Sequence, residues 1–213
     1  MAILCGVDEA GRGPLIGPLV ICGTTIDDDK VNELIKIGVK DSKLLTPKKR
    51  EELFPLIKNT VKDYKLIVIP AEEVDEALNS ESINLNWLEA IKTGMIINYL
   101  RPERAIVDCP SNNIQAYTEY LENLLKEKIP LKLEHNAERY PIVAAASILA
   151  KVTRDNLIEE LKKKYGDFGS GYPSDPKTKE FLINHWKTHP EIFRKTWASY
   201  KRIANQTTLG NFK

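Results

Sequence analysis

The stretch that decides the fold lies at the start of the chain. Residues 3–14 read Ile3-Leu4-Cys5-Gly6-Val7-Asp8-Glu9-Ala10-Gly11-Arg12-Gly13-Pro14. The apolar run that ends at Asp8 predicts a strand, and the residues from Gly11 to Pro14 predict a turn. A second strand is expected over Leu15–Ile26. An aspartate that closes a buried strand lies at the carboxyl edge of the sheet, where open α/β sheets hold their ligands.

The rest of the chain alternates between strand-like and helix-like segments. Further strands are expected over residues 64–70, 104–108 and 130–134, and helices over residues 30–37, 47–60, 71–78, 84–100, 114–126 and 141–164. A turn-rich break at residues 166–176 precedes a second helical stretch over Pro176–Ile203. This order predicts an α/β layered domain with a mixed sheet, and the C-terminal helices are expected to form a small cap.

The composition is that of a soluble globular protein, with 42% hydrophobic and 29% charged residues. Apolar runs stay short of the ~20 residues that span a bilayer. The first residues lack the basic and then apolar layout of a signal peptide. The three cysteines, an odd number in apolar surroundings, suit a reducing compartment better than a disulfide framework. We therefore expect a cytoplasmic protein, and we expect it to be a monomer.

The charge is distributed unevenly although the formal net charge is only +1. Residues 1–150 hold 18 basic and 23 acidic residues, whereas residues 151–213 hold 13 basic and seven acidic residues. A basic C-terminal part could contact phosphate groups while an acidic body holds cations. On charge alone, a solvated helical surface explains the same pattern.

Asp8 and Asp108 share one context, because each follows a short apolar run. Two such strands side by side would bring both carboxylates within reach of one metal ion, and Glu9 would add a third. Neighbouring side chains of a strand point to opposite faces, so the strand must end or twist there for Asp8 and Glu9 to converge, and the Gly11–Gly13 turn is expected to supply that break. Clustered carboxylates need a cation to ionise together, and oxygen ligands favour Mg²⁺ or Mn²⁺ over Zn²⁺. The alternative is that each aspartate only begins a turn.

Four blocks of the sequence resemble the ribonuclease HII family, in the style of its archaeal members. They stand in the family's order, and the resemblance covers the chain from residue 3 to about residue 200. The blocks are Gly6-Val7-Asp8-Glu9-Ala10-Gly11-Arg12-Gly13-Pro14 with Ile16-Gly17-Pro18, then Val39-Lys40-Asp41-Ser42-Lys43-Leu44-Leu45-Thr46, then the segment from Tyr140-Pro141 to Arg154-Asp155, and finally Tyr165-Gly166-Asp167-Phe168-Gly169-Ser170-Gly171-Tyr172-Pro173-Ser174-Asp175-Pro176.

This resemblance implies a ribonuclease-H-like fold with a five-stranded mixed sheet flanked by helices. It implies a catalytic domain over residues 1–170, a C-terminal helical cap over residues 171–204 and a flexible tail over residues 205–213. The implied activity is hydrolysis of the RNA strand of RNA/DNA hybrids, including single ribonucleotides in duplex DNA, in DNA replication and repair. Two metal ions would support phosphodiester hydrolysis that leaves 3′-hydroxyl and 5′-phosphate ends.

The resemblance also implies roles for individual residues. Asp8, Glu9 and Asp108 would bind Mg²⁺ or Mn²⁺. Gly11, Arg12 and Gly13 would read the junction between a ribonucleotide and the following deoxynucleotide, because glycines let backbone amides approach the 2′-hydroxyl that separates RNA from DNA. Tyr172 would stack on the sugar beyond the ribose, although a packed aromatic in a turn is the alternative. The residues suited to phosphate contact are Ser42, Lys43, Ser147 and Lys151.

One block departs from the family's pattern. The family's fourth acid is an aspartate in a block that reads His-x-Ala-Asp-x-x-Tyr-Pro, whereas this chain reads His135-Asn136-Ala137-Glu138-Arg139-Tyr140-Pro141. The block is one residue short, and the missing residue is the aspartate. Either Glu138 substitutes as a catalytic acid with its longer side chain, or the second metal ion is held weakly. The three histidines of the chain are too scattered for a zinc site.

Two other functions remain open at this point. The same fold hosts nucleases that act on DNA, and the lost fourth acid makes a non-catalytic binder of RNA/DNA hybrids conceivable. The clustered acids favour the enzyme, since a binder has no need of them.

The C-terminal tail resembles the peptide that binds a replication sliding clamp. Gln206, Leu209 and Phe212 match a pattern of Gln, two residues, an aliphatic residue, two residues and an aromatic ring. Leu209 and Phe212 are three residues apart, so one helical turn would aim both at the same apolar pocket. Lys213 stands where a second aromatic residue is usual, which predicts weak binding. An ordinary frayed terminus is the alternative.

Overall fold

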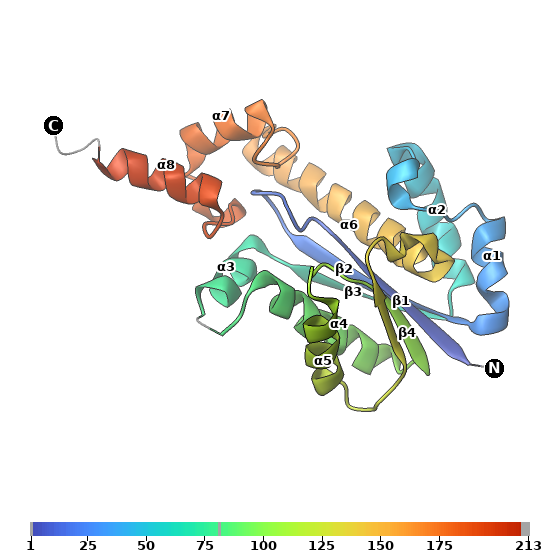
Figure 1. Cartoon of the computed structure of the whole chain (residues 1–213). Coiled ribbons are helices and arrows are strands. Elements are labelled where there is room, and N and C mark those ends of the chain that lie inside the picture. Colours follow the sequence, from blue (N-terminus) through green and yellow to red (C-terminus); the bar gives the residue numbers. More distant parts are fainter. Residues whose placement is uncertain (1, 81, 210–213) are drawn as a thin grey trace. The chain divides into compact units, whose positions relative to one another are not determined.

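A computed structural model describes residues 2–80 and 82–209, with side chains described up to residue 206 (Figure 1). The chain forms two compact units. The first, here called the sheet unit, consists of Met1–Ala10, Val20–Val68 and Asn86–Arg154. The second, here called the helical unit, consists of Gly11–Leu19, Ile69–Leu85 and Asp155–Lys213.

The sheet has five strands in the order β3-β2-β1-β4-β5. β1 pairs antiparallel with β2 and parallel with β4, and β4 pairs parallel with β5, so the sheet is mixed as the sequence predicts. The strands are β1 (Ile3–Ala10), β2 (Leu19–Asp27), β3 (Asp63–Ile69), β4 (Arg104–Asp108) and β5 (Leu131–Glu134).

Two strand boundaries differ from the expected ones. β1 continues past Asp8 to Ala10, because Glu9 and Ala10 still pair with β2. β2 begins at Leu19 rather than Leu15. The backbone amides of Leu15 and Ile16 donate instead to the carbonyl oxygen of Gly171, at 2.8 and 3.2 Å, so this segment belongs to the helical unit.

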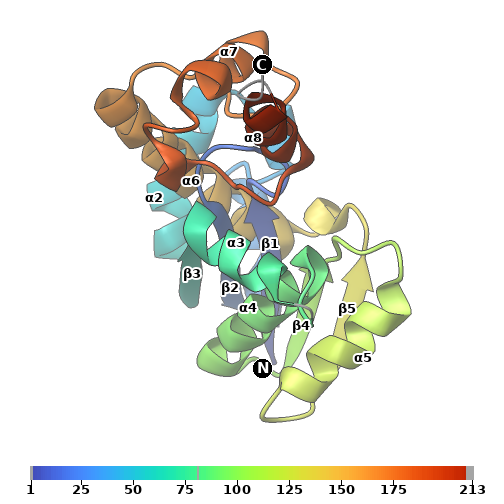
Figure 2. The same ribbon diagram turned by 90° about the vertical axis from the view of Figure 1, so that its left-hand side faces the viewer.

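Helices cover both faces of the sheet within the sheet unit (Figures 1 and 2). On one face, Gly6 lies so close to the start of α6 that an added Cβ atom would come within 2.5 Å of the Ile142 backbone. On the other face, Gly23 is overlain by Ile96 of α4. The helical segments are η1 (Asp28–Lys30), α1 (Val31–Lys36), η2 (Ser42–Leu44), α2 (Pro47–Thr60), α4 (Leu85–Leu100), α5 (Ile114–Leu124), η3 (Ala137–Arg139) and α6 (Pro141–Tyr165), the last of which continues into the helical unit.

Local sequence signals account for several of these helices. The hydroxyl of Thr46 accepts a hydrogen bond from the Lys49 amide at 3.2 Å, and Pro47 occupies the first turn of α2, as predicted. The side chain of Asn113 caps α5 in the same manner. Ala144, Ala145 and Ala146 at the start of α6 are fully buried, so the run of small residues permits close packing.

The helical unit has an apolar core of its own. Its helices are α3 (Ala71–Asn79), α7 (Pro176–His185), η4 (Pro190–Ile192) and α8 (Ala198–Leu209), together with the last part of α6. The core consists of Leu15, Ile16, Ile158, Phe168, Phe181, Leu182, Ile192, Phe193 and Tyr200.

The expected helical stretch over Pro176–Ile203 is interrupted, because residues 186–197 between α7 and α8 are largely irregular. Here the carboxylate of Asp75 accepts hydrogen bonds from the backbone amides of Lys195 and Thr196, at 2.6 and 2.9 Å, which holds the segment outside a helix. α8 continues to Leu209, so the expected start of the tail at Asn205 lies inside a helix. The division into a catalytic domain, a cap and a tail stays a prediction. No helix in the described part of the chain is long and apolar enough to cross a membrane.

Candidate active site

Asp8 and Asp108 lie side by side because β1 and β4 are parallel and in register. Val7 is paired with Val107, so the next residue of each strand is an aspartate. Asp8 is buried and Asp108 is half-buried. The predicted juxtaposition of the two carboxylates is therefore present in the structure.

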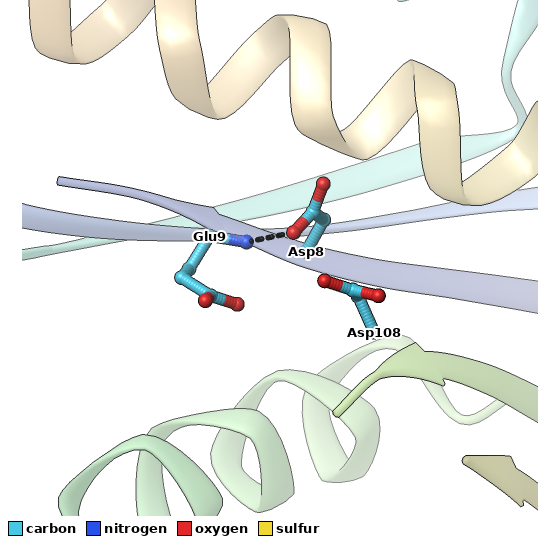
Figure 3. Close-up of side chains that lie close together, drawn as sticks. All are labelled: Asp8, Glu9 and Asp108. Carbon is cyan, nitrogen blue, oxygen red and sulfur yellow. Dashed lines mark hydrogen bonds between the residues drawn. The ribbon is translucent and has the colours of Figure 1, made fainter. Parts of the chain in front are cut away.

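Glu9 completes the acidic cluster. Asp8, Glu9 and Asp108 each offer one carboxylate oxygen, and these oxygens all lie within 4.8 Å of one another (Figure 3). β1 does not end at Asp8, because it runs on to Ala10 and stops directly before the glycine turn. β4 ends at Asp108 while β1 continues, and Figure 3 shows the Glu9 side chain turned toward the Asp108 carboxylate at this place.

Burial and mutual repulsion both act on the acidic cluster. Burial raises the pKa of Asp8 to about 8, and the neighbouring charges of Asp108 and Glu138 act in the same direction. Hydrogen bonds from the Ser147 hydroxyl and from the Glu9 amide, the latter at 2.7 Å, oppose this rise in pKa. The pKa of Asp108 is also raised by burial, and the Ala137 amide opposes the rise by donating to it at 2.7 Å.

The cluster fits a hard divalent cation. Its potential ligands are carboxylate oxygens, with no histidine or cysteine in the group, which is the donor set that Mg²⁺ and Mn²⁺ prefer. A cation between the oxygens would offset both the burial and the like-charge repulsion that raise the pKa of Asp8.

Glu138 lies beside the cluster rather than in it. Among the described residues, the group that could hold a metal ion contains Asp8, Glu9 and Asp108. Glu138 is buried in η3 and forms an ion pair with the ammonium group of Lys43. Its charge nevertheless reaches the cluster, because it contributes to the raised pKa of both Asp8 and Asp108.

Ser42 and Ser147 form part of the support of Asp8. Their hydroxyl oxygens lie 2.9 Å apart, both residues are buried, and Ser147 also hydrogen-bonds Asp8. Lys151 is half-buried one helical turn after Ser147 on α6. Phosphate contact by Ser42, Lys43, Ser147 and Lys151 stays a prediction.

Sequence reasoning missed two residues in this region. Arg50 is buried and donates from its guanidinium to the carbonyl oxygens of Ser42 and Leu45, at 3.0 and 2.7 Å, and so holds the segment that carries Lys43. His135 contacts the Cys109 carbonyl through Nδ1 at 2.8 Å, and its charge lowers the pKa of Asp108. A lone arginine on a helix and a lone histidine carry no pattern that would have revealed either role.

The residues expected to read the junction lie in the helical unit. Gly11 has a φ of +92°, a conformation that favours glycine. A Cβ atom on Gly13 would lie 3.4 Å from the ring of Tyr172, so these two residues are neighbours. Tyr172 is 43% exposed, which leaves part of its ring open to a ligand. Of the tail residues, Gln206 is exposed near the end of α8, whereas the side chain of Leu209 and all of Phe212 lie outside the described residues.

This chain is similar in sequence and in fold to proteins of known family. Residues 5–200 match the family model of ribonuclease HII. Ribonuclease HII of Pyrococcus furiosus is 45% identical to this chain, and the match covers 97% of this chain and 96% of that protein. The crystal structure of ribonuclease H2 from Pyrococcus horikoshii OT3 superposes with a TM-score of 0.88 at 43% identity, over 97% of this chain and 99% of that one.

A second solved structure is that of the PCNA:RNase HII complex from Archaeoglobus fulgidus. It matches with a TM-score of 0.81 at 40% identity, over 92% of this chain and 95% of that one. These matches confirm the predicted ribonuclease-H-like fold. The chain therefore belongs to the ribonuclease HII family, and it is a ribonuclease H that hydrolyses the RNA strand of RNA/DNA hybrids.

Proposed function

We propose that this enzyme cuts duplex DNA on the 5′ side of a single embedded ribonucleotide, as well as the RNA strand of continuous hybrids. The products would carry a 3′-hydroxyl and a 5′-phosphate, and the reaction would use two divalent ions, Mg²⁺ or Mn²⁺. The observation that carries the proposal is the approach of the Asp8, Glu9 and Asp108 carboxylate oxygens to within 4.8 Å in a chain of this family.

Asp8, Glu9 and Asp108 would hold the metal ions. When bound, such ions activate water as a nucleophile and stabilise the charge that develops on the phosphate. The protein's own contribution is to fix the ligands. The Glu9 and Ala137 amides orient the carboxylates of Asp8 and Asp108, and Ser147 holds Asp8 from α6. Fixed carboxylates lose little freedom when a cation binds, which favours binding.

Gly11, Arg12 and Gly13 would read the ribose, with Tyr172 placed against the next sugar. The proximity of Gly13 to the ring of Tyr172 supports this assignment, since a Cβ atom added to Gly13 would lie 3.4 Å from that ring and Tyr172 is exposed. A ribose offers the 2′-hydroxyl as a donor and acceptor, whereas the flat face of an aromatic ring suits a sugar that lacks this group. The combination would select a ribonucleotide followed by DNA.

Lys43 and Lys151 would contribute positive charge toward the phosphate backbone. Lys43 is 70% exposed at its side chain, so its ammonium group can reach a ligand while it neutralises Glu138. Ser42 and Ser147 would contact phosphate only by exchanging part of their present hydrogen bonding, since their hydroxyl groups already bond each other.

The C-terminal tail would bind a replication sliding clamp through Gln206, Leu209 and Phe212. The complex of the Archaeoglobus fulgidus relative with PCNA supports this proposal. We further propose that the enzyme acts as a monomer in the cytoplasm, where it serves DNA replication and repair.

The test compares three matched duplexes: one with a single ribonucleotide, one with a continuous RNA strand and one of DNA alone. Each is incubated with Mg²⁺, with Mn²⁺ and with a chelator, and the product ends are mapped. Metal-dependent cleavage 5′ to the single ribonucleotide supports the proposal. Cleavage of the DNA duplex at the same rate would favour a DNA-directed nuclease, and binding of the hybrid without any cleavage would favour a pure binder.

A further inference from the structure

Arg194 is fully buried in the helical unit, and its guanidinium group binds the loop that begins at Gly11. Nη2 donates to the Gly11 carbonyl at 2.6 Å, Nη1 to the Arg12 carbonyl at 2.8 Å and Nε to the Gly17 carbonyl at 3.1 Å. Arg194 is more than 175 residues away from all three acceptors in the sequence. A charged group with no exposed surface needs such partners, because an unpaired buried charge is very costly.

Trp197 adds a fourth side-chain hydrogen bond to the same loop. Its indole Nε1 donates to the Gly13 carbonyl at 3.2 Å, and the Arg194 guanidinium lies 4.9 Å from the centre of its ring. Between these two residues, the amides of Lys195 and Thr196 are bound by the Asp75 carboxylate. Segment 194–197 is therefore fixed on α3 by the amides of Lys195 and Thr196. It binds the loop through the Arg194 and Trp197 side chains and through the Arg194 amide, which donates to the Leu15 carbonyl at 2.9 Å.

The hydrogen bonds from Arg194 determine the direction in which the backbone amides of the loop point. A trans peptide is planar, so the carbonyl of one residue and the amide of the next point in opposite directions. The carbonyls of Gly11 and Arg12 point at the Arg194 guanidinium. The amides of Arg12 and Gly13 consequently point away from Arg194. A row of amides with a common direction is suited to binding an electron-rich group such as a hydroxyl or phosphate oxygen.

We propose that Arg194 and Trp197 are positioning residues for junction recognition, which hold the Gly11–Gly13 loop in its reading conformation. The inference rests on the proposed function in which this loop reads the ribonucleotide junction. A merely structural arginine would stabilise the fold and leave substrate choice unchanged. A positioning arginine controls discrimination between substrates, because a loosened loop no longer presents its amides to the ribose in one geometry.

The main experiment uses Arg194→Lys in the full chain. Lysine keeps the charge but has one donor nitrogen in place of the planar fork, so it cannot reach all three carbonyls in the same geometry. We expect the ratio of kcat/KM for the single-ribonucleotide duplex over the continuous hybrid to fall by about tenfold. A merely structural role would instead lower both kcat/KM values in proportion to the folded fraction, which thermal unfolding measures.

A second, more conservative variant with its own control keeps the inference testable if Arg194→Lys does not fold. Trp197→Phe removes the donor to Gly13 but keeps an aromatic ring, and we expect it to lower the same ratio by about threefold. Trp186→Phe is the matched control, since Trp186 packs against Tyr200 in the same unit, and among the described residues the indole donor to this loop is that of Trp197. The control should leave the ratio unchanged.

Arg12→Ala separates a failure of this inference from a failure of the proposed function. If Arg12→Ala lowers the ratio while Arg194→Lys and Trp197→Phe leave it at the wild-type value in folded protein, the positioning role is wrong and junction reading by the loop stands. If Arg12→Ala, Arg194→Lys and Trp197→Phe all leave the ratio unchanged in folded protein, the loop does not read the junction, and both ideas are overturned.

Discussion

Lys43 and Glu138 form an ion pair in which the carboxylate is buried and the ammonium group belongs to an exposed side chain. The pair raises the pKa of Lys43, so the ammonium group stays charged beside the acidic cluster. Glu138 follows the place where the family has its fourth acid, and here its charge is already balanced by a lysine. A second metal ion would therefore compete with Lys43 for this carboxylate.

Inserting an aspartate between Ala137 and Glu138 is expected to lower the Mg²⁺ concentration at half-maximal cleavage. The inserted carboxylate would supply a ligand that Lys43 does not already neutralise. We expect a shift of about tenfold, which corresponds to one added charge-assisted contact. The measurement is a metal titration of single-turnover cleavage.

An inserted asparagine is the matched control for this experiment, since it restores the length of the block without the charge. If aspartate and asparagine give the same metal requirement as the parent chain, Glu138 already fills the role of the fourth acid. In that case Glu138→Ala should abolish activity.

Asp8→Asn and Asp108→Asn are each expected to reduce cleavage by about three orders of magnitude, on the scale of losing an essential charge-stabilising group. The fold should persist, because asparagine has nearly the same shape and still accepts the Glu9 or Ala137 amide. Single-turnover rates combined with circular dichroism test this. Near-normal cleavage rates in both variants would show that the active site lies elsewhere.

The metal-free enzyme should become less stable as pH rises from about 4 to about 8. Burial raises the pKa of Asp8 from 3.8 to about 8, so in this range the folded state keeps a proton that the unfolded chain has released. The sign follows directly: unfolding releases a proton, and a higher pH favours proton release. Mg²⁺ should restore more stability at pH 8 than at pH 5, because it binds the ionised cluster.

Thermal unfolding in EDTA and in Mg²⁺ across this pH range measures the effect. Asp8→Asn should flatten the pH dependence of the metal-free protein, since asparagine does not titrate. A slope that is as steep in Asp8→Asn as in the parent would assign the effect to other groups.

The strand pairing and the acidic cluster could be predicted because they depend on local patterns. Apolar runs ending in Asp8 and Asp108 indicate two strand ends, and parallel register then brings the residues together. The role of Arg194 could not be predicted, because it depends on a contact with a loop 183 residues away at Gly11. The start of β2 could not be predicted for the same reason, since the amides of Leu15 and Ile16 donate to the carbonyl oxygen of the distant Gly171.

Arg12→Ala and Tyr172→Ala should both erode the preference for a single ribonucleotide over a continuous RNA strand, by about tenfold each. The reason is that each side chain is expected to recognise the junction more than it contributes to overall affinity. The ratio of kcat/KM values for the two substrates is the readout. An equal loss on both substrates would assign these residues to general binding instead.

The tail is expected to bind the cognate sliding clamp weakly and through its apolar residues. Gln206 lies exposed on α8. Leu209 and Phe212 are three residues apart in the sequence, so one helical turn in the complex would aim both at the same apolar pocket of the clamp. Leu209→Ala with Phe212→Ala should raise the Kd by at least about thirtyfold, since two buried apolar anchors are lost.

Titration of the clamp with the intact chain and with the double variant measures this change in Kd. Lys201→Ala with Arg202→Ala serves as a control on the same helix. Indistinguishable binding by the intact chain and the double variant would discard the clamp-binding motif, while the control pair shows whether charge on α8 accounts for any binding that remains.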